Sequence, residues 1–234
     1  MAKSPIPVMR KILAPIHPDG HKFVVIAAAL AFVLGIFAWA PLGWFLFLLT
    51  IAIALFFRDP ERTTPEKGGM VVAPADGLVV AVDRAAPPPE LGVEEEMQRV
   101  SIFLSLLDCH VNRAPVTGEV KRIEYQIGRF LSANNPDAGQ DNERNSLLLE
   151  DRNGMQTVCV QIAGKLARRI VSSVEEGEHL LVGERIGLIR FGSRVDVYFS
   201  DDLHVRVGIE QRVIGGETIL ADSQAHELLN FMTR

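Results

Sequence analysis

A glycine–serine pair, Gly192-Ser193, separates two apolar segments within residues 187–199. A serine hydroxyl can attack the carbonyl carbon of the preceding residue where the backbone bends the two together, and a glycine at that carbonyl relieves crowding. The resulting ester is a better leaving group than an amide, so loss of the serine Cα proton would allow β-elimination, and hydrolysis would then leave a pyruvoyl group. Taken alone, a Gly-Ser pair between two strands is most often an ordinary turn.

His110 follows an apolar segment that ends at Leu107 and precedes Pro115, which places it near a strand end or in a loop. A histidine whose pKa lies near neutrality can take the serine proton and later return it. The alternative is a surface histidine or one with a purely structural hydrogen bond. Asp76, in the turn Pro74–Gly77, could orient such a histidine as the carboxylate of a hydrolase triad does. Only the tertiary fold could bring Asp76, His110 and Ser193 together.

Two further groups of polar residues could contact a polar substrate. The segment 141–145 includes Glu143 and Arg144, and Arg168 lies in a segment with helical spacing, 164–172. Each group could equally face solvent. The histidines have no spacing typical of metal ligands, and two cysteines are too few for a disulfide framework or a zinc site, so we expect no metal.

An uncharged segment of 35 residues, Phe23–Phe57, is interrupted by Pro41-Leu42-Gly43. Two apolar halves of this length are near the lower limit for crossing a bilayer, which predicts a transmembrane helical hairpin over Phe23–Ala40 and Trp44–Phe57. Basic residues lie on both sides of the hairpin and none lies in its turn: Arg10, Lys11, Lys22, Arg58, Arg62 and Lys67. The positive-inside rule places both ends in the cytoplasm. The alternative is a buried hairpin of a soluble protein.

The remainder of the chain alternates short apolar runs with Gly, Pro and Asp, which predicts a mainly β (α+β) fold, a compact barrel or sandwich with one or two helices. The strands are expected at 71–73, 78–83, 99–104, 118–125, 146–150, 156–162, 185–190 and 195–199, and a helix at 164–172. A net charge of −5 and the absence of a long basic run argue against nucleic acid as a partner.

Together these segments resemble the phosphatidylserine decarboxylase proenzymes, in their short bacterial form. The resemblance covers nearly the whole chain in six ordered blocks: 57–62, 74–77, 109–115, 141–145, 161–170 and 190–196. It implies a cytoplasmic segment 1–22, a membrane hairpin 23–57 and a catalytic domain 58–234 at the inner membrane.

The resemblance also implies self-cleavage between Gly192 and Ser193, into a β chain 1–192 and an α chain 193–234 that stay together non-covalently and could dimerise further. Ser193 would become a pyruvoyl group that forms a Schiff base with the phospholipid substrate, with no external cofactor. His110 would be the general acid or base, Asp76 would orient it, and phosphatidylethanolamine and CO₂ would be released. The candidate ligands of the substrate head group are Arg113, Glu143, Arg144 and Arg168.

One position departs from the longer family members, which carry a second histidine three residues after the first. Here that position is Arg113. Either His110 carries both proton transfers, or another group takes one of them.

Two other functions use the same residues. The segment Glu175–Gly192 is similar to half-motifs of lipoyl-type sandwiches, which suggests a membrane-tethered carrier module, although no lysine follows Lys165 to carry the modification. A serine hydrolase would use Ser193, His110 and Asp76 in an intact chain, but the Gly-x-Ser-x-Gly signature is missing.

Overall fold

The computed structural model describes residues 14–37, 39–128, 142–164, 169–190 and 193–224. Its contacts divide the chain into two compact units, Met1–Glu61 and Arg62–Arg234.

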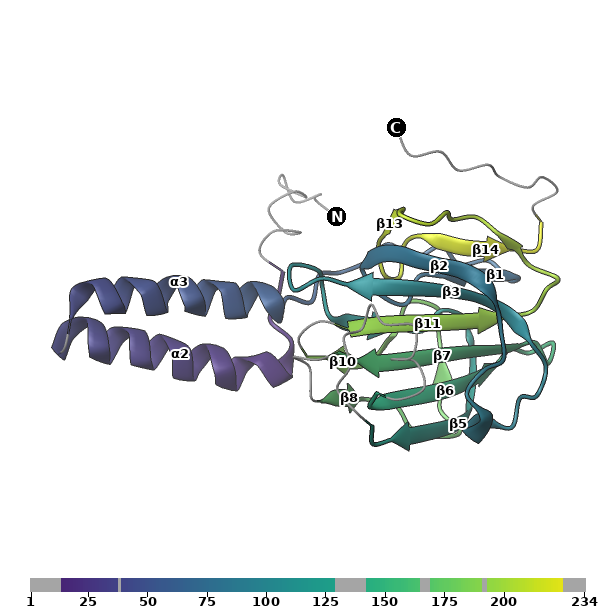
Figure 1. The fold of residues 1–234 in the computed structure, drawn as a ribbon, viewed down its shortest axis with the longest axis horizontal. Coiled ribbons are helices and arrows are strands. Elements are labelled where there is room, and N and C mark those ends of the chain that lie inside the picture. The colour runs from purple at the N-terminus through teal and green to yellow at the C-terminus, as the bar shows by residue number, and fades with distance from the viewer. Residues whose placement is uncertain (1–13, 38, 129–141, 165–168, 191–192, 225–234) are drawn as a thin grey trace, which may run out of the picture. The chain divides into compact units, whose positions relative to one another are not determined.

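The first unit contains two antiparallel helices, α2 (Pro18–Phe37) and α3 (Ala40–Phe56), which lie side by side (Figure 1). Their backbones approach closely at two glycines, since a Cβ on Gly43 would lie 2.4 Å from the Cα of Gly35. The predicted turn at residues 41–43 is wrong, because α3 already begins at Ala40. Pro41 lies in its first turn, where a helix needs no N–H donor and proline is tolerated.

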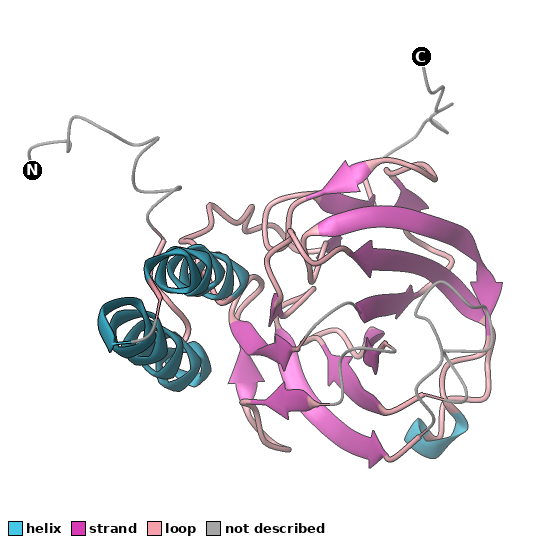
Figure 2. Cartoon of the chain, turned by 60° about the vertical axis from the view of Figure 1, so that its left-hand side comes forward, coloured by secondary structure: helices cyan, strands magenta, loops and turns pink. Residues whose placement is uncertain are grey.

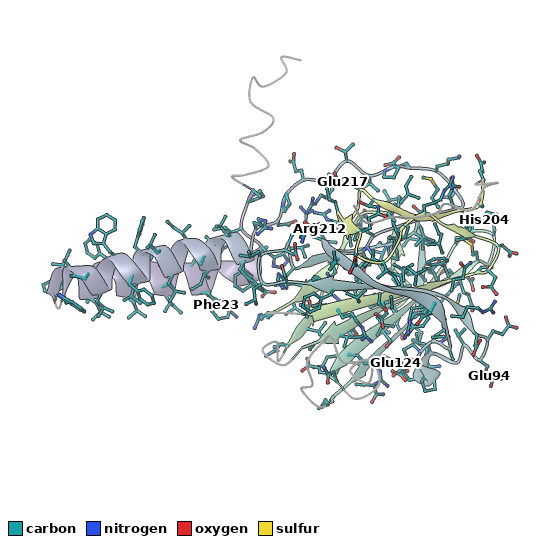
Figure 3. All side chains as sticks on the ribbon, turned by 45° about the horizontal axis from the view of Figure 1, so that its top comes forward. Phe23, Glu94, Glu124, His204, Arg212 and Glu217 are labelled. Carbon is teal, nitrogen blue, oxygen red and sulfur yellow. The ribbon has the colours of Figure 1, made fainter. Side chains whose placement is uncertain are left out.

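Apolar side chains cover the outside of this hairpin. Val25, Phe32 and Trp44 are each about two-thirds exposed, and Figure 3 shows such side chains projecting around the helices, with Phe23 labelled. The 20-residue α2 is long and apolar enough to cross a bilayer, with a mean hydropathy of 2.0, and α3 is a shorter apolar helix. These properties are consistent with membrane association.

The second unit consists of three antiparallel sheets, which curl around a common interior (Figure 2). The largest has eight strands in the order β13-β2-β3-β11-β7-β6-β5-β9, and the two smaller sheets have the orders β4-β10-β8 and β1-β14-β12. The elements are β1 (Met70–Val72), β2 (Gly77–Ala85), the 3-10 turn η1 (Pro89–Leu91), β3 (Met97–Leu104), β4 (Val111–Arg113), β5 (Gly118–Gln126), β6 (Arg144–Glu150), β7 (Gln156–Ala163), β8 (Ile170–Ser172), β9 (His179–Leu180), β10 (Arg185–Ile189), β11 (Ser193–Phe199), β12 (His204–Val205), β13 (Arg212–Val213) and β14 (Ile219–Asp222).

Strand β11 lies at the centre of the large sheet, between β3 and β7, and all seven of its residues are buried. Because side chains alternate along a strand, Val195, Val197 and Phe199 enter the main core inside the curled sheet. Tyr198 packs on the outer face against a second cluster that includes Leu91 and Val160. Arg194 and Asp196 alternate with the core residues and are also buried, and they form an ion pair with each other.

The mainly β fold class is confirmed, and each of the eight predicted strands overlaps an observed one. The helix predicted at 164–172 is wrong where it can be compared, because Ile170–Ser172 forms strand β8. Ile170 is buried opposite Ile189 of β10, so tertiary pairing outweighs the helical spacing, and two consecutive β-branched residues favour the extended form. Residues 165–168 of that prediction lie outside the described residues.

A glycine in β10 permits the close pairing of β10 with β8. Gly187 has φ 149°, and a Cβ there would lie 2.1 Å from the carbonyl oxygen of Val171.

We expect Gly187→Ala to lower the free energy of unfolding of the second unit by about 2–4 kcal/mol, since it adds a backbone clash to an unfavourable φ. Chemical denaturation of Gly187→Ala and of the wild-type chain measures this loss. Gly154→Ala is the matched control, because Gly154 also has a positive φ (80°) but open space around it, and it should cost only about 1–2 kcal/mol. Equal losses in the two variants would contradict the proposed clash.

Candidate active site

Ser193 is the first residue of β11 and is fully buried. It lies opposite Leu104, the last residue of β3, on one side and opposite Ala163, the last residue of β7, on the other. Its hydroxyl has no hydrogen-bond partner within the described part of the chain. The predicted partner in cleavage, Gly192, lies outside the described residues. The structure therefore places a buried, unengaged hydroxyl at the ends of three neighbouring strands.

The chain changes sheets just before Ser193. Strand β10 ends at Ile189 in the sheet β4-β10-β8, whereas β11 begins at Ser193 in the eight-stranded sheet. The connection must therefore leave one ladder and enter another within a few residues. The predicted cleavage site therefore lies where the chain passes from one sheet to another.

His110 is fully buried and immediately precedes β4. Its carbonyl oxygen accepts a hydrogen bond from the N–H of Ile189 at 3.2 Å, so His110 lies beside the segment that leads to Ser193. Its Nδ1 lies 3.0 Å from the carbonyl oxygen of Asp108. A carbonyl can only accept, so Nδ1 carries the proton and a neutral ring has its lone pair on Nε2. This is the tautomer that a general base needs.

The turn before His110 is held by Asp108, which the sequence analysis did not identify. Oδ2 of Asp108 accepts hydrogen bonds from the N–H of Ser105 at 2.8 Å and from its hydroxyl at 2.6 Å. Oδ1 pairs with Arg212, which is labelled in Figure 3. Since the carbonyl of the same residue holds His110, Asp108 fixes both the turn and the ring. The serine and aspartate three residues apart were the available signal for such a turn.

Asp76 is held by an arginine and a backbone amide. Arg62 donates to both of its carboxylate oxygens, at 2.8 and 2.7 Å, and the N–H of Gly215 donates to Oδ1 at 2.8 Å. Burial lowers the pKa of Arg62, but the ion pair with Asp76 outweighs burial and raises it above its ordinary value. The turn that carries Asp76 also contacts β4, because Pro74 accepts from the N–H of Arg113 at 2.8 Å. That Asp76 orients His110 stays a prediction.

Three of the four predicted head-group ligands already have protein partners, and the fourth, Arg168, lies outside the described residues. Arg113 is buried and donates to the carbonyl oxygen of Gly183 at 2.9 Å. Glu143 is buried and accepts from the hydroxyl of Tyr125 at 2.6 Å and from the N–H of Ile170 at 3.1 Å. Partial burial and the hydrogen bond to Glu143 raise the pKa of Tyr125 to about 12.

Arg144 forms an ion pair with Glu90 and thereby fastens η1 to β6. Its Nε lies 2.7 Å from Oε1 and its Nη2 3.1 Å from Oε2. Burial alone would raise the pKa of Glu90, but the hydrogen bonds that its carboxylate accepts, from Arg144 above all, and the charge of Arg144 together outweigh burial and lower the pKa. This pairing makes Arg144 a structural residue in the present conformation.

A chain of three buried amides also lies near Ser193, and the sequence analysis missed it. Gln161 donates to Oδ1 of Asn112 at 2.8 Å and accepts from Nδ2 of Asn145 at 2.9 Å. The three residues come from three strands, β4, β7 and β6. Their separation in the sequence leaves no local signal of the contact. Among the described residues, no cluster of three or more His, Cys, Asp or Glu side chains could hold a metal ion.

The comparisons with known proteins agree on one family. The family model for phosphatidylserine decarboxylase matches residues 49–221. A relative from Beijerinckia indica subsp. indica, named phosphatidylserine decarboxylase proenzyme, is 51% identical over 217 residues, 92% of this chain and 93% of its own. The chain belongs to the phosphatidylserine decarboxylase family. Proenzymes of the same name from Ruegeria pomeroyi and Cereibacter sphaeroides are each 48% identical, over 91% and 95% of this chain and 97% and 96% of their own.

Membership in the phosphatidylserine decarboxylase family confirms the resemblance that the six sequence blocks indicated. The family model covers all six of those blocks, from 57 to 196, and the last part of the predicted hairpin. None of the matches supports a lipoyl-type carrier or a serine hydrolase.

The ion pair between Glu90 and Arg144 makes stability depend on pH. A carboxyl whose pKa is lowered on folding stabilises the fold above its unfolded pKa of about 4.3 and loses that contribution as the pH falls through the folded value. We expect Glu90→Gln to lower the free energy of unfolding by about 1–2 kcal/mol at pH 7. The difference in this free energy between the variant and the wild type should shrink as the pH falls below about 4. Denaturant unfolding at several pH values across this range measures the difference. Glu124→Gln, which removes the exposed ion pair with Arg122, is the control. A gap that does not change with pH would contradict the assignment.

Proposed function

We propose that the chain is made as a proenzyme, cuts its own backbone between Gly192 and Ser193, and then decarboxylates phosphatidylserine to phosphatidylethanolamine in phospholipid biosynthesis. The observation that carries the proposal is the buried, unengaged hydroxyl of Ser193 at the start of β11, four residues after Ile189, whose N–H donates to the carbonyl oxygen of His110. The names of the relatives, phosphatidylserine decarboxylase proenzyme, supply the substrate and the precursor form.

Self-cleavage uses groups of this chain. Oγ of Ser193 attacks the carbonyl carbon of Gly192 while Nε2 of His110 takes the hydroxyl proton. The Oγ–C bond forms, the C–N bond breaks, and the amine of Ser193 takes a proton, which leaves an ester between the two residues. Removal of the Ser193 Cα proton then expels the carboxylate of Gly192. The unsaturated residue takes up water and releases ammonia, which leaves a ketone at position 193.

The residues around Ser193 fit a pyruvoyl group. Position 193 is fully buried and its hydroxyl oxygen has no partner among the described residues, so converting the side chain to a methyl group breaks no described hydrogen bond. Leu104 and Ala163, its two neighbours across the sheet, are apolar. When present, a pyruvoyl group supplies a carbonyl that binds the substrate amine and withdraws the electron pair left by CO₂.

His110 would serve decarboxylation as a proton donor to the carbon that loses CO₂. Asp76 would act by orienting His110, with Arg62 holding that carboxylate in place through their ion pair. Arg113, Glu143, Arg144 and Arg168 remain the proposed contacts of the head group. The first three would have to exchange a present protein partner for the substrate, which demands a rearrangement on binding.

Membrane attachment suits this substrate, because its acyl chains stay in the bilayer. The apolar hairpin α2–α3 would hold the protein at the membrane where the head groups lie. The basic residues on either side of the uncharged stretch, such as Lys22 and Arg58, support a cytoplasmic location for both of its ends and for the catalytic domain.

After cleavage the two chains would remain together. Strand β11 belongs to the 193–234 fragment, yet it is hydrogen-bonded on both sides to β3 and β7 of the 1–192 fragment. Strands β13 and β14 pair in the same way with β2 and β1. The product would therefore be a non-covalent heterodimer of an α and a β chain.

The purified full chain should consist of two fragments, 1–192 and 193–234, when its intact mass is measured in denaturant. The smaller should be lighter than a serine-initiated chain by one ammonia, and the two should co-elute from a sizing column without denaturant. Ser193→Ala should stay a single chain without decarboxylase activity, whereas Ser173→Ala, at an exposed position, should be processed normally. An active wild-type enzyme that consists only of the intact chain would overturn the proposal.

His110→Gln should slow processing and decarboxylation together, because the variant retains hydrogen bonding but has no basic lone pair. The loss expected for a general acid or base is about 10²–10⁴-fold in each step. Release of phosphatidylethanolamine from phosphatidylserine in mixed micelles measures the second step, and the amount of processed chain normalises it. His204→Gln, in the exposed strand end of β12, is the control that should leave both rates unchanged. Wild-type rates in His110→Gln would exclude this role.

A further inference from the structure

The three-amide chain ends in a donor that has nothing to bind. Asn112, Gln161 and Asn145 are all at most 1% exposed. Oδ1 of Asn112 accepts from Gln161, but Nδ2 of Asn112 is buried and has no hydrogen-bond partner within the described residues. Leaving a buried amide N–H unpaired is costly, so such a group requires an explanation.

This donor lies on the face of the sheet to which Ser193 belongs. Gln161 and Ala163 are two residues apart in β7 and so share a face, and Ala163 lies opposite Ser193. Gln161 is therefore the diagonal neighbour of Ser193, a spacing of about 7–8 Å that a long side chain can bridge. The adjacent labelled strands β3, β11 and β7 can be followed in Figure 1. The amide chain that ends in the unpaired N–H of Asn112 thus passes one diagonal position from the unpaired hydroxyl of Ser193.

The direction of the amide chain determines which atom Asn112 presents. Nδ2 of Asn145 donates to Gln161, which leaves Nε2 of Gln161 to donate to Oδ1 of Asn112. An amide that accepts through its oxygen must offer its nitrogen elsewhere. The two hydrogen bonds of the amide chain therefore run in one direction, from Asn145 through Gln161 to Asn112. This direction leaves Nδ2 of Asn112 as a donor at the end of the amide chain.

We propose that Nδ2 of Asn112 donates a hydrogen bond to the Gly192 carbonyl oxygen as it becomes an oxyanion during self-cleavage, and that Gln161 and Asn145 are positioning residues. The proposal rests on the self-cleavage proposed above. When Oγ of Ser193 bonds to the carbonyl carbon, the C=O electron pair moves onto the oxygen, and it returns when the C–N bond breaks. Because the attacked carbon bonds both oxygens, a donor near Oγ is near the oxyanion. A fixed N–H in a water-free interior stabilises that charge strongly.

Asn112→Asp tests the donor directly. The carboxylate still accepts from Gln161, but it offers no N–H, and its negative charge would further oppose the oxyanion. Loss of one oxyanion donor should slow conversion of the 234-residue chain into its two fragments about 10²–10³-fold. Pulse-labelled synthesis of the full chain into detergent micelles, sampled by intact mass, measures this rate without using decarboxylase activity.

Asn145→Asp tests the relay from a distance. An aspartate cannot donate to Gln161, so the amide of Gln161 should turn to donate toward residue 145, and Asn112 should turn to donate to Gln161. Asn112 would then present its oxygen to the oxyanion, and processing should slow although residue 112 is unchanged. If the amide chain had only a structural role, Asn145→Asp would change the midpoint of thermal unfolding but would not specifically slow processing.

Thr157→Val is the matched control. Thr157 lies in the same strand and on the same face as Gln161, and its hydroxyl is also buried without a partner in the described residues. It lies six residues from Ala163, about 20 Å along the strand. This variant should be processed at the wild-type rate. Slow processing in Thr157→Val would show a general effect of core substitutions and would overturn the proposal.

Hydroxylamine identifies which step is slow. It cleaves an ester but not the original amide, so it should not accelerate cleavage of Asn112→Asp if ester formation is the blocked step. Rapid hydroxylamine cleavage of that variant would place the block after the ester and contradict the proposal. Wild-type processing in Asn112→Asp or Asn145→Asp would also contradict it. A wild-type chain that never cleaves would instead refute the proposed function.

Discussion

The pairing of β11 with strands on both sides is the constraint on which the active region depends. Seven consecutive residues of β11 are matched with β3 and six with β7, so the position of Ser193 is set by two ladders at once. Both faces of the strand are buried, which leaves little freedom for its backbone. The preceding strand β10 belongs to another sheet. The hydroxyl proposed as the nucleophile of self-cleavage is therefore held at the start of a strand that is fixed on both sides.

The polar groups near Ser193 are tolerated in an apolar interior because other groups of the protein satisfy their hydrogen bonds. Asp108 holds the ring of His110 through its backbone oxygen while its carboxylate closes the preceding turn. Asp76 is neutralised by Arg62, so its negative charge is not left unpaired in a partly buried position. The buried polar atoms without a partner in the described residues include the hydroxyl of Ser193 and Nδ2 of Asn112, and both belong to the proposed self-cleavage reaction.

Much of this arrangement could be predicted from the sequence, and the rest could not for physical reasons. Apolar alternation located the central strands, and Gly192-Ser193 and His110 are recognisable as reactive types near strand ends. The spacing of Ile170 fits a helix as well as a strand, and only its pairing with Ile189 decides between them. Contacts such as Gln161 with Asn112, separated by 49 positions, follow from strand order rather than local pattern. Arg144 looked like a ligand because its partner Glu90 lies 54 positions earlier in the chain.

The central claim is that Ser193 is the residue at which the chain divides and that it is chemically changed in doing so. Tandem mass spectrometry of the smaller fragment from the wild-type protein tests this claim most directly, because it reads the first residue itself. The account predicts a keto-acyl group in amide linkage to Arg194, with no free amine at that terminus. A fragment that begins with an unmodified serine, or one that begins at any other residue, would contradict it.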